Sequence, residues 1–182
     1  IIGSSLDIPP YVYIENENIT AFPDRVTESY GKAFWREGKT GADFNHQEVM
    51  DRFLSKSKEF VSTNKDKPFF LYLPLSAPHT PILPKDKFKD KSGINEYTDF
   101  VLQVDDLVGQ LKSHLDSHGL LEDTIIVFAS DNGVAPMADL PELKARNHHP
   151  SNGYRGHKSD IYEGGHRVPL IVSWGRKGIK GK

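Results

Sequence analysis

Two long segments of the chain carry apolar residues at the spacing of an α-helix. In residues 45–64, and again in residues 95–117, the apolar positions recur every three or four residues and define one face. Asn45 followed three residues later by Glu48 is the pattern of a capping box, and Gly119 suits the end of the second segment. The pattern therefore predicts two amphipathic helices whose apolar faces are ordinary core.

Three short apolar runs have the length and composition of β-strands. Residues 68–75 and 124–130 are mainly apolar, which is typical of strands buried on both faces of a sheet. Residues 168–174 form a third run, in which Pro169 indicates an edge or a preceding loop. Because strand, long helix and strand form a βαβ unit, the first two runs should lie parallel with a right-handed crossover. The expected fold class is α/β.

The first 45 residues show no strong period. Residues 11–14 suit a short strand, and Asn16-Glu17-Asn18 suits a turn after it. Several prolines and glycines break up the rest of this region, so we expect it to be irregular.

Composition narrows the classes of function. The 182 residues, 37% hydrophobic and 26% charged, are typical of one globular domain. A formal net charge of −2 argues against a nucleic-acid partner, which would require a basic face. A run of lysines at positions 85, 87, 89 and 91 alternates with Asp86 and Asp90 and indicates a solvated loop or helix start. No apolar stretch approaches the ~18 residues of a membrane span, and the first residues do not resemble a signal peptide.

Candidate chemistry follows the predicted strands, because ligands of α/β sheets bind beyond the carboxyl ends of their strands. The run at residues 68–75 leads into a turn in which Pro78 and Pro81 flank His79. The prolines restrict the backbone and hold the imidazole at the rim of the sheet. The alternative is a His that merely bonds a neighbouring carbonyl group.

The run at residues 124–130 leads into Asp131, Asn132 and Gly133. A carboxylate beside a side-chain amide supplies two hard oxygen atoms, which suit Ca²⁺ or Mg²⁺ rather than a softer transition metal. The alternative is a structural Asx turn after a strand.

A glycine-rich and charged loop at residues 155–167 precedes the last predicted strand. Its Lys158 suits an anionic oxygen atom as a point charge. Glu163 and Arg167 are better suited to anchoring the loop, by pairing or by bonding to the backbone. Two further histidines, at positions 148 and 149, are either subsite residues or, as we favour, solvated loop residues.

These three features, in this order, resemble the sulfatase family. The matching motifs are Pro78-His79-Thr80-Pro81, Ser130-Asp131-Asn132-Gly133, and Gly156-x-Lys158 leading to Glu163-Gly164-Gly165-x-Arg167-Val168-Pro169. The stretch Ser5-Leu6-Asp7-Ile8-Pro9-Pro10-Tyr11-Val12 also looks like sulfatase sequence, so the resemblance covers nearly the whole chain. The Asp-Asn-Gly piece is common by itself, whereas a Glu-Gly-Gly-x-Arg loop at this distance from it is fairly specific.

The resemblance implies an alkaline-phosphatase-like fold, with a mostly parallel sheet flanked by helices, and hydrolysis of sulfate esters around one divalent cation. It implies that Asp131 and Asn132 are ligands of that cation, with Ca²⁺ favoured over Mg²⁺. It also implies that His79 contacts the sulfate or bridging oxygen and helps the leaving group depart, and that Lys158 grips the sulfate oxygens. The partner it implies is a sulfated small molecule or carbohydrate, and the location is periplasmic or secreted.

The resemblance also shows which parts of the family pattern are missing from residues 1–182. The family nucleophile is a formylglycine made from Cys or Ser in a Cys/Ser-x-Pro-x-Arg motif, and this chain has no Cys. Its nearest match, Ser76-Ala77-Pro78-His79-Thr80, has Thr in place of Arg and already fits the histidine motif. We therefore expect a partial catalytic domain that lacks the upstream nucleophile segment and the C-terminal part, and that is inactive alone.

Two other functions remain open at this point. One is a phosphate or phosphonate ester hydrolase of the same superfamily, although such enzymes typically use two metals with additional His ligands. The other is a non-catalytic protein that binds a sulfated ligand. Residues 138–152 are the candidate specificity loop, but their sequence does not encode a particular substrate.

Overall fold

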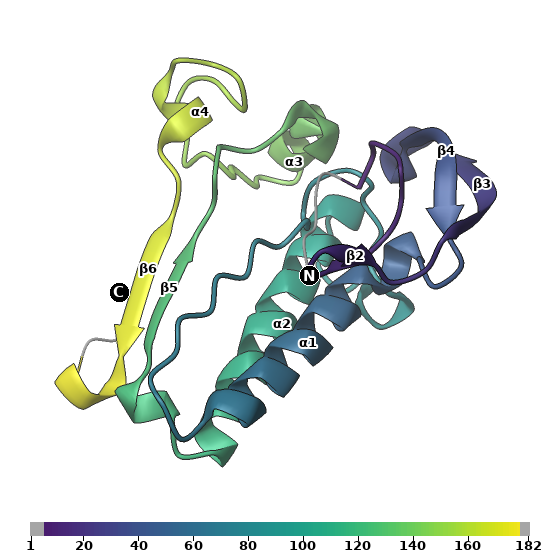
Figure 1. Ribbon diagram of the computed structural model, residues 1–182. Helices are drawn as coiled ribbons and strands as arrows, with labels where there is room; N and C mark the ends of the chain where they lie inside the picture. Colours follow the sequence, from purple (N-terminus) through teal and green to yellow (C-terminus); the bar gives the residue numbers. More distant parts are fainter. Residues whose placement is uncertain (1–5, 179–182) are drawn as a thin grey trace. The chain divides into compact units, whose positions relative to one another are not determined.

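The computed structural model describes residues 6–178, which form two compact units (Figure 1). The first unit extends to Leu111, and the second begins at Lys112. Over the described range, no helix is both long enough and apolar enough to cross a membrane.

Helix α1 spans Val49–Asn64 and confirms the first predicted helix. A 3-10 turn, His46–Glu48, precedes it, and the Asn45 side chain accepts a hydrogen bond from Gln47 N at 3.0 Å. Its buried face consists of Val49, Met50, Phe53, Leu54, Ser57 and Val61. The apolar period in the sequence thus marks the side of α1 that faces the core.

Helix α2 spans Glu96–Ser117 and confirms the second predicted helix. Asn95 and Thr98 form a reciprocal cap, in which each side-chain oxygen accepts a hydrogen bond from the backbone N–H of the other residue. Helices α1 and α2 lie side by side (Figure 1), and the ammonium group of Lys58 donates to the Gln110 amide oxygen at 3.2 Å. Gly119, with φ of 68°, follows the end of α2 as predicted.

The first 45 residues are more regular than their sequence indicates. Strands β1 (Ile14–Glu15) and β2 (Asn18–Ile19) form a small hairpin, and strands β3 (Pro23–Ser29) and β4 (Trp35–Gly41) form a longer antiparallel pair. The prediction of an irregular region is therefore wrong over β3 and β4. Strand β3 is mostly polar and none of its residues is fully buried, so it has no continuous apolar run to reveal it.

One core cluster of the first unit is built from aromatic residues of this region and the start of α1. Its buried members are Tyr11, Tyr13, Phe44, Val49 and Phe53. Trp35, Leu73 and Leu75 pack against this cluster from its edge. Aromatic residues from the first 45 positions thus pack against Val49 and Phe53, near the start of α1.

Residues 68–75 are extended but are not part of a sheet. No strand pairs with this segment anywhere in residues 6–178, so the prediction of a strand there is wrong. One side of the segment packs on α1, where Phe69 meets Phe60 edge to face at 5.7 Å, while Phe70 is 85% exposed. A strand is defined by hydrogen bonds to a neighbour, and the first unit offers none here. The parallel arrangement with residues 124–130 stays a prediction, because that run belongs to the second unit.

The second unit contains the other two predicted strands. Strands β5 (Ile125–Ala129) and β6 (Leu170–Trp174) pair antiparallel, with Val127 opposite Val172. Their existence is confirmed, but the predicted burial of β5 on both faces is wrong, since Val127 is 60% exposed. The described strands of the second unit form a two-stranded ribbon, which leaves one face of each strand uncovered.

Short helices and turns complete both units. Helices α3 (Leu140–Ala145) and α4 (Glu163–His166) lie in the loops between β5 and β6. The remaining 3-10 turns are Gly31–Ala33, Asp86–Phe88, Leu121–Asp123, Pro136–Ala138 and Gly175–Lys177. The lysine run is solvated, as predicted, and its ion pairs are Lys85–Asp51, Lys87–Asp106 and Lys89–Asp86.

Candidate functional site

The loop after β5 presents two oxygen-bearing side chains. Asp131 is exposed, and no hydrogen bond or ion pair of its carboxylate is found within residues 6–178. The Asn132 amide nitrogen donates to Gly133 O at 2.9 Å, which leaves the amide oxygen as the group available to a cation. Ser130 Oγ donates to Asn132 O at 2.8 Å and so tightens the same turn.

Gly133 brings this loop against the glycine-rich loop at residues 155–167. Gly133 N donates to Gly165 O at 2.9 Å. A Cβ atom at Gly133 would overlap the backbone of Gly164, so only glycine permits this approach. One residue later, Val134 O accepts a hydrogen bond from Lys158 N at 2.8 Å. The fold therefore brings together the loops that carry Asp131, Asn132 and Lys158.

The Lys158 ammonium group has no carboxylate partner in the part of the chain that the structure describes. Lys158 is half-buried, and the hydrogen bond from its N–H group to Val134 O holds its backbone in place. An ammonium group without an internal counter-ion, held on an ordered loop, is suited to bind an anion.

Two residues of the glycine-rich loop anchor it, as predicted. Glu163 pairs with Arg167 at 3.2 Å, and Arg167 N donates to Glu163 O at 2.8 Å across α4. The Arg167 guanidinium also stacks on Tyr154, 4.6 Å from the ring centroid. Arg155 stacks on Tyr162 at 3.7 Å. Both arginines are therefore held by contacts within the loop.

His79 lies in the first unit, on an exposed turn. His79 N donates to Ser76 O at 3.0 Å, and Nδ1 lies 2.7 Å from Thr80 O. A carbonyl oxygen only accepts, so Nδ1 carries a proton and Nε2 is the ring atom available to a ligand. The alternative interpretation of His79 predicts a bond to a neighbouring carbonyl group, and the ring does make one. The convergence of His79 with Lys158 stays a prediction, because the two residues belong to different units.

The other two candidate histidines lie in the loop after α3. His148 is half-buried, and His149 is exposed. Backbone groups make the hydrogen bonds of this segment within residues 6–178, for example His148 N to Leu143 O at 2.9 Å. These contacts agree with solvated loop residues and give no evidence of a subsite.

The donor set of Asp131 and Asn132 fits a hard cation but does not complete a site. Ca²⁺ takes six to eight oxygen ligands, whereas these residues offer a carboxylate and one amide oxygen. No cluster of three or more His, Asp or Glu side chains able to hold a metal occurs in residues 6–178. Further ligands would have to come from water, substrate or other segments.

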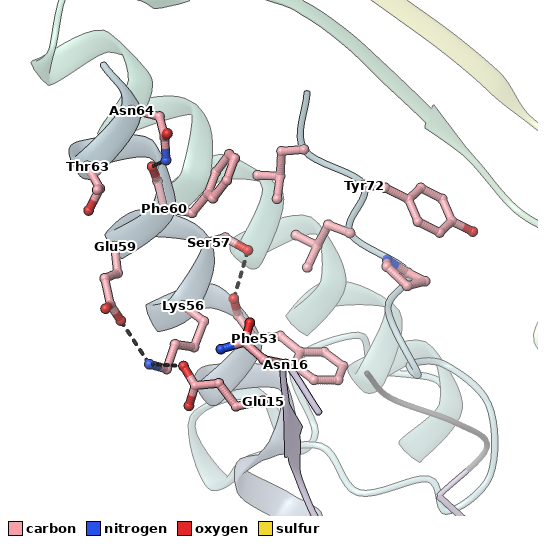
Figure 2. Close-up of a pocket in the computed structure, with 13 residues that line it drawn as sticks. Glu15, Asn16, Phe53, Lys56, Ser57, Glu59, Phe60, Thr63, Asn64 and Tyr72 are labelled. Atoms are coloured by element: carbon pink, nitrogen blue, oxygen red, sulfur yellow. Dashed lines mark hydrogen bonds and ion pairs between the residues drawn. The ribbon is translucent and has the colours of Figure 1, made fainter. Parts of the chain in front are cut away.

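A cavity of about 360 Å³ in the first unit contains none of the predicted site residues (Figure 2). It lies between α1 and the extended segment at residues 71–74. Its charged residues are satisfied internally, since the Lys56 ammonium bonds both Glu15 and Glu59, at 2.9 and 3.1 Å. Ser57 Oγ likewise donates to Phe53 O at 2.8 Å. The cavity contains none of the residues of the strand-end loops.

Sequence reasoning missed the residues that hold these loops together. The sequence marks Gly133 only as the residue after Asp131-Asn132, yet the two loops pack so closely there that a Cβ atom would overlap Gly164. Asp160, which accepts a hydrogen bond from His157 N at 3.0 Å, carried no signal of its own. Its place two residues after Lys158, in a segment with positive φ at Ser159, becomes informative only once the turn is seen.

Comparisons with known proteins identify the family to which the chain is similar. Residues 10–180 match the family model described as Sulfatase. An N-acetylgalactosamine-6-O-sulfatase of Bacteroides thetaiotaomicron is 36% identical over 146 residues, covering 79% of this chain and 29% of that protein. The human steryl-sulfatase is 35% identical over 135 residues, covering 72% of this chain and 22% of that protein. The chain thus spans less than a third of the length of these curated relatives.

Solved structures give the fold. A structure from work on the metabolism of multiple glycosaminoglycans by Bacteroides thetaiotaomicron has a TM-score of 0.81 and 28% identity, covering 97% of this chain and 45% of that one. A second structure, of Ps i-CgsB in complex with k-i-k-neocarrahexaose, has a TM-score of 0.61 and 31% identity, covering 73% and 29%. The chain therefore has the fold of part of a sulfatase catalytic domain, in the alkaline-phosphatase-like α/β class.

Proposed function

Because this chain belongs to the sulfatase family, we propose that the protein carrying it hydrolyses sulfate esters. One observation carries the proposal most directly. Within residues 6–178, the Asp131 carboxylate and the Lys158 ammonium group have no charged partner, and they lie on loops joined by two backbone hydrogen bonds, Gly133 to Gly165 and Lys158 to Val134. An anion accompanied by a cation satisfies both charges at once.

The residues of these loops have complementary roles in the proposed reaction. Lys158 binds the sulfate oxygens and stabilises the negative charge that grows on them in the transition state. Asp131 and Asn132 would hold a divalent cation, for which Ca²⁺ is our proposal on the chemistry of their oxygen atoms. When bound, such a cation supplies Lewis-acid stabilisation of a sulfate oxygen.

His79 is proposed to act on the leaving group. Its Nδ1 is engaged by Thr80 O, so the ring is oriented and Nε2 is left to contact the bridging oxygen. A second proton on Nε2 could then pass to the departing alcohol, as general acid catalysis requires.

The substrate class we propose is a sulfated carbohydrate. Relatives of this chain are named as N-acetylgalactosamine-6-sulfatases, and one similar structure holds a neocarrahexaose. The loop at residues 138–152, which contains α3, is our candidate for selecting among such substrates. A periplasmic or secreted location, which suits extracellular polysaccharides, also remains a prediction.

The nucleophile is proposed to lie outside these 182 residues. The sequence contains no Cys, and its Ser76-Ala77-Pro78-His79-Thr80 stretch lacks the Arg of the family motif. Residues 1–182 by themselves should therefore hydrolyse no sulfate ester.

The test compares 4-nitrophenyl sulfate with 4-nitrophenyl phosphate as substrates of the full-length protein. We expect sulfate turnover that falls about 100- to 1000-fold in a Lys158→Ala variant, in line with the loss of one transition-state donor. Chelation of divalent cations should also abolish most of the turnover. A Lys112→Ala variant, exposed on α2, is the matched control and should keep full activity.

Two outcomes would reject the proposal. Preferential turnover of the phosphate ester would assign the site to phosphoryl transfer. Binding of sulfated oligosaccharides in calorimetry, without turnover of any ester, would make the protein a binding protein instead.

A further inference from the structure

Asp160 closes the four-residue turn that carries Lys158. Asp160 N donates to His157 O at 3.0 Å, and the Asp160 carboxylate accepts a hydrogen bond from His157 N, also at 3.0 Å. Lys158 and Ser159 are therefore the two central residues of the turn. Ser159 has φ of 77°, which is the conformation of the third residue of a type II turn, where glycine is usual. A serine held there requires neighbouring contacts that maintain the turn.

The turn is also fixed to the rest of the site. Both backbone polar groups of Lys158 are bonded, since its N–H donates to Val134 O at 2.8 Å and its carbonyl accepts from His157 Nδ1 at 2.9 Å. The Asp160 backbone packs directly on Gly165, where a Cβ atom would overlap Asp160 O. Gly165 in turn accepts the hydrogen bond from Gly133. Asp160 thus links the Lys158 turn to the loop of Asp131.

We propose that Asp160 is a positioning residue for Lys158, an inference that rests on the proposed sulfatase function of this site. No ion pair joins Asp160 to Lys158 within the described residues, and Nδ1 of the His157 ring lies 3.6 Å from the Asp160 carboxylate. A carboxylate near an anion-binding ammonium group weakens anion binding by its charge. Its useful property here is the oxygen atom that accepts the His157 N–H group.

This role predicts different effects on activity for two substitutions of Asp160. Asp160→Asn keeps an acceptor oxygen and the side-chain volume but removes the charge, so it should keep activity within about threefold or raise it. Asp160→Ala removes the acceptor and frees the turn, and a displaced catalytic group costs on the order of 10- to 100-fold in kcat/KM for 4-nitrophenyl sulfate. Both variants should melt within a few degrees of the wild-type full-length protein.

Asp123→Ala provides the matched control. Asp123 is an exposed aspartate of the same unit, it pairs with Arg176, and it precedes β5 at the end opposite Asp131. Its removal should leave sulfate turnover within about twofold of wild type.

Hydrogen exchange provides a readout that does not depend on turnover. In the full-length protein, the Lys158 amide should exchange at least about tenfold faster in Asp160→Ala and at the wild-type rate in Asp160→Asn. If wild type shows no sulfate turnover, the proposed function fails and the exchange rates alone decide the role of Asp160. An Asp160→Ala variant with the wild-type exchange rate of the Lys158 amide and the wild-type kcat/KM would overturn the inference. So would an Asp160→Asn variant as impaired as Asp160→Ala, because the charge would then be the essential property.

Discussion

Gly133 lies where the two loops of the candidate site pack backbone against backbone. Its N–H group bonds Gly165 O at 2.9 Å, and any Cβ atom would overlap the Gly164 backbone. The neighbour is backbone rather than a flexible side chain, so it has little freedom to move aside. The distance between Asp131 and Lys158 therefore depends on this position.

Gly133→Ala should displace one loop and lower both stability and activity. We expect a loss of about 1–3 kcal/mol in the free energy of unfolding, typical of overpacking, and at least about a tenfold loss of sulfate turnover. Urea unfolding and 4-nitrophenyl sulfate kinetics on the full-length protein measure the two effects.

The control for this change is Gly109→Ala. Gly109 lies in α2 with no atom within 4 Å of the position of a Cβ, so alanine there should stabilise the helix by about 0.5–1 kcal/mol. Equal effects of the two substitutions would show that the Gly133 contact does not hold the loops together.

For single residues, the sequence indicates which side chains have suitable chemistry for a site, but it does not indicate which residues they contact. Asp131, Asn132 and Lys158 stand out because their motifs occur together, in the order and at the spacing that resemble the sulfatase family. Asp160 does not stand out, because its role depends on a turn and on packing against Gly165. Such contacts depend on how two loops meet, which no local pattern encodes.

Among the elements, the 3-10 turn His46–Glu48 places a buried histidine against Trp35 of strand β4. His46 is 8% exposed and stacks on Trp35 at 3.9 Å, with Tyr11 edge-on at 4.6 Å. Burial lowers the pKa of His46 to about 4, from 6.5 for a solvated imidazole. The folded state therefore holds the neutral ring, and protonation favours unfolding.

The direction of the pH effect follows from this depressed pKa. Above about pH 6.5 both states are neutral and nothing is lost, whereas stability falls as the pH drops from 6.5 towards 4. The loss due to His46 should reach about 2 kcal/mol near pH 5. Urea unfolding of wild type and His46→Phe at pH 7.5 and 5 would measure it as a difference. An equal loss in both proteins would mean that His46 is not buried as a neutral ring.

The sequence predicts an element correctly where its buried residues recur at a regular spacing or form a continuous apolar run. Helices α1 and α2 and strands β5 and β6 were found within a few residues of their observed bounds. The β3–β4 hairpin was missed because its exposed face interrupts the pattern with polar residues. The run at residues 68–75 has the composition of a buried strand, but it needs a partner that the first unit does not supply.

For the molecule as a whole, exposed apolar surface is the main physical liability. Phe70 and Tyr72 of the extended segment are 85% and 76% exposed, and Leu170 of β6 is 69% exposed. Unpaired extended backbone adds unsatisfied hydrogen-bonding groups along the same segment. In a complete sheet such side chains and backbone groups are covered by neighbouring strands and helices.

Residues 1–182, prepared alone, should therefore be poorly stable. We expect a broad thermal transition, binding of a hydrophobic dye in the native buffer, and a tendency to associate. A sharp, cooperative transition of a monomer in calorimetry would contradict this expectation.

A crystal structure of the full-length protein with bound sulfate and Ca²⁺ tests the central claim most directly. We predict one sulfate group within about 3.2 Å of both Lys158 Nζ and His79 Nε2. A cation beside it should lie about 2.3–2.6 Å from oxygen atoms of Asp131 and Asn132. A sulfate held elsewhere, with Lys158 and His79 far apart, would contradict the account.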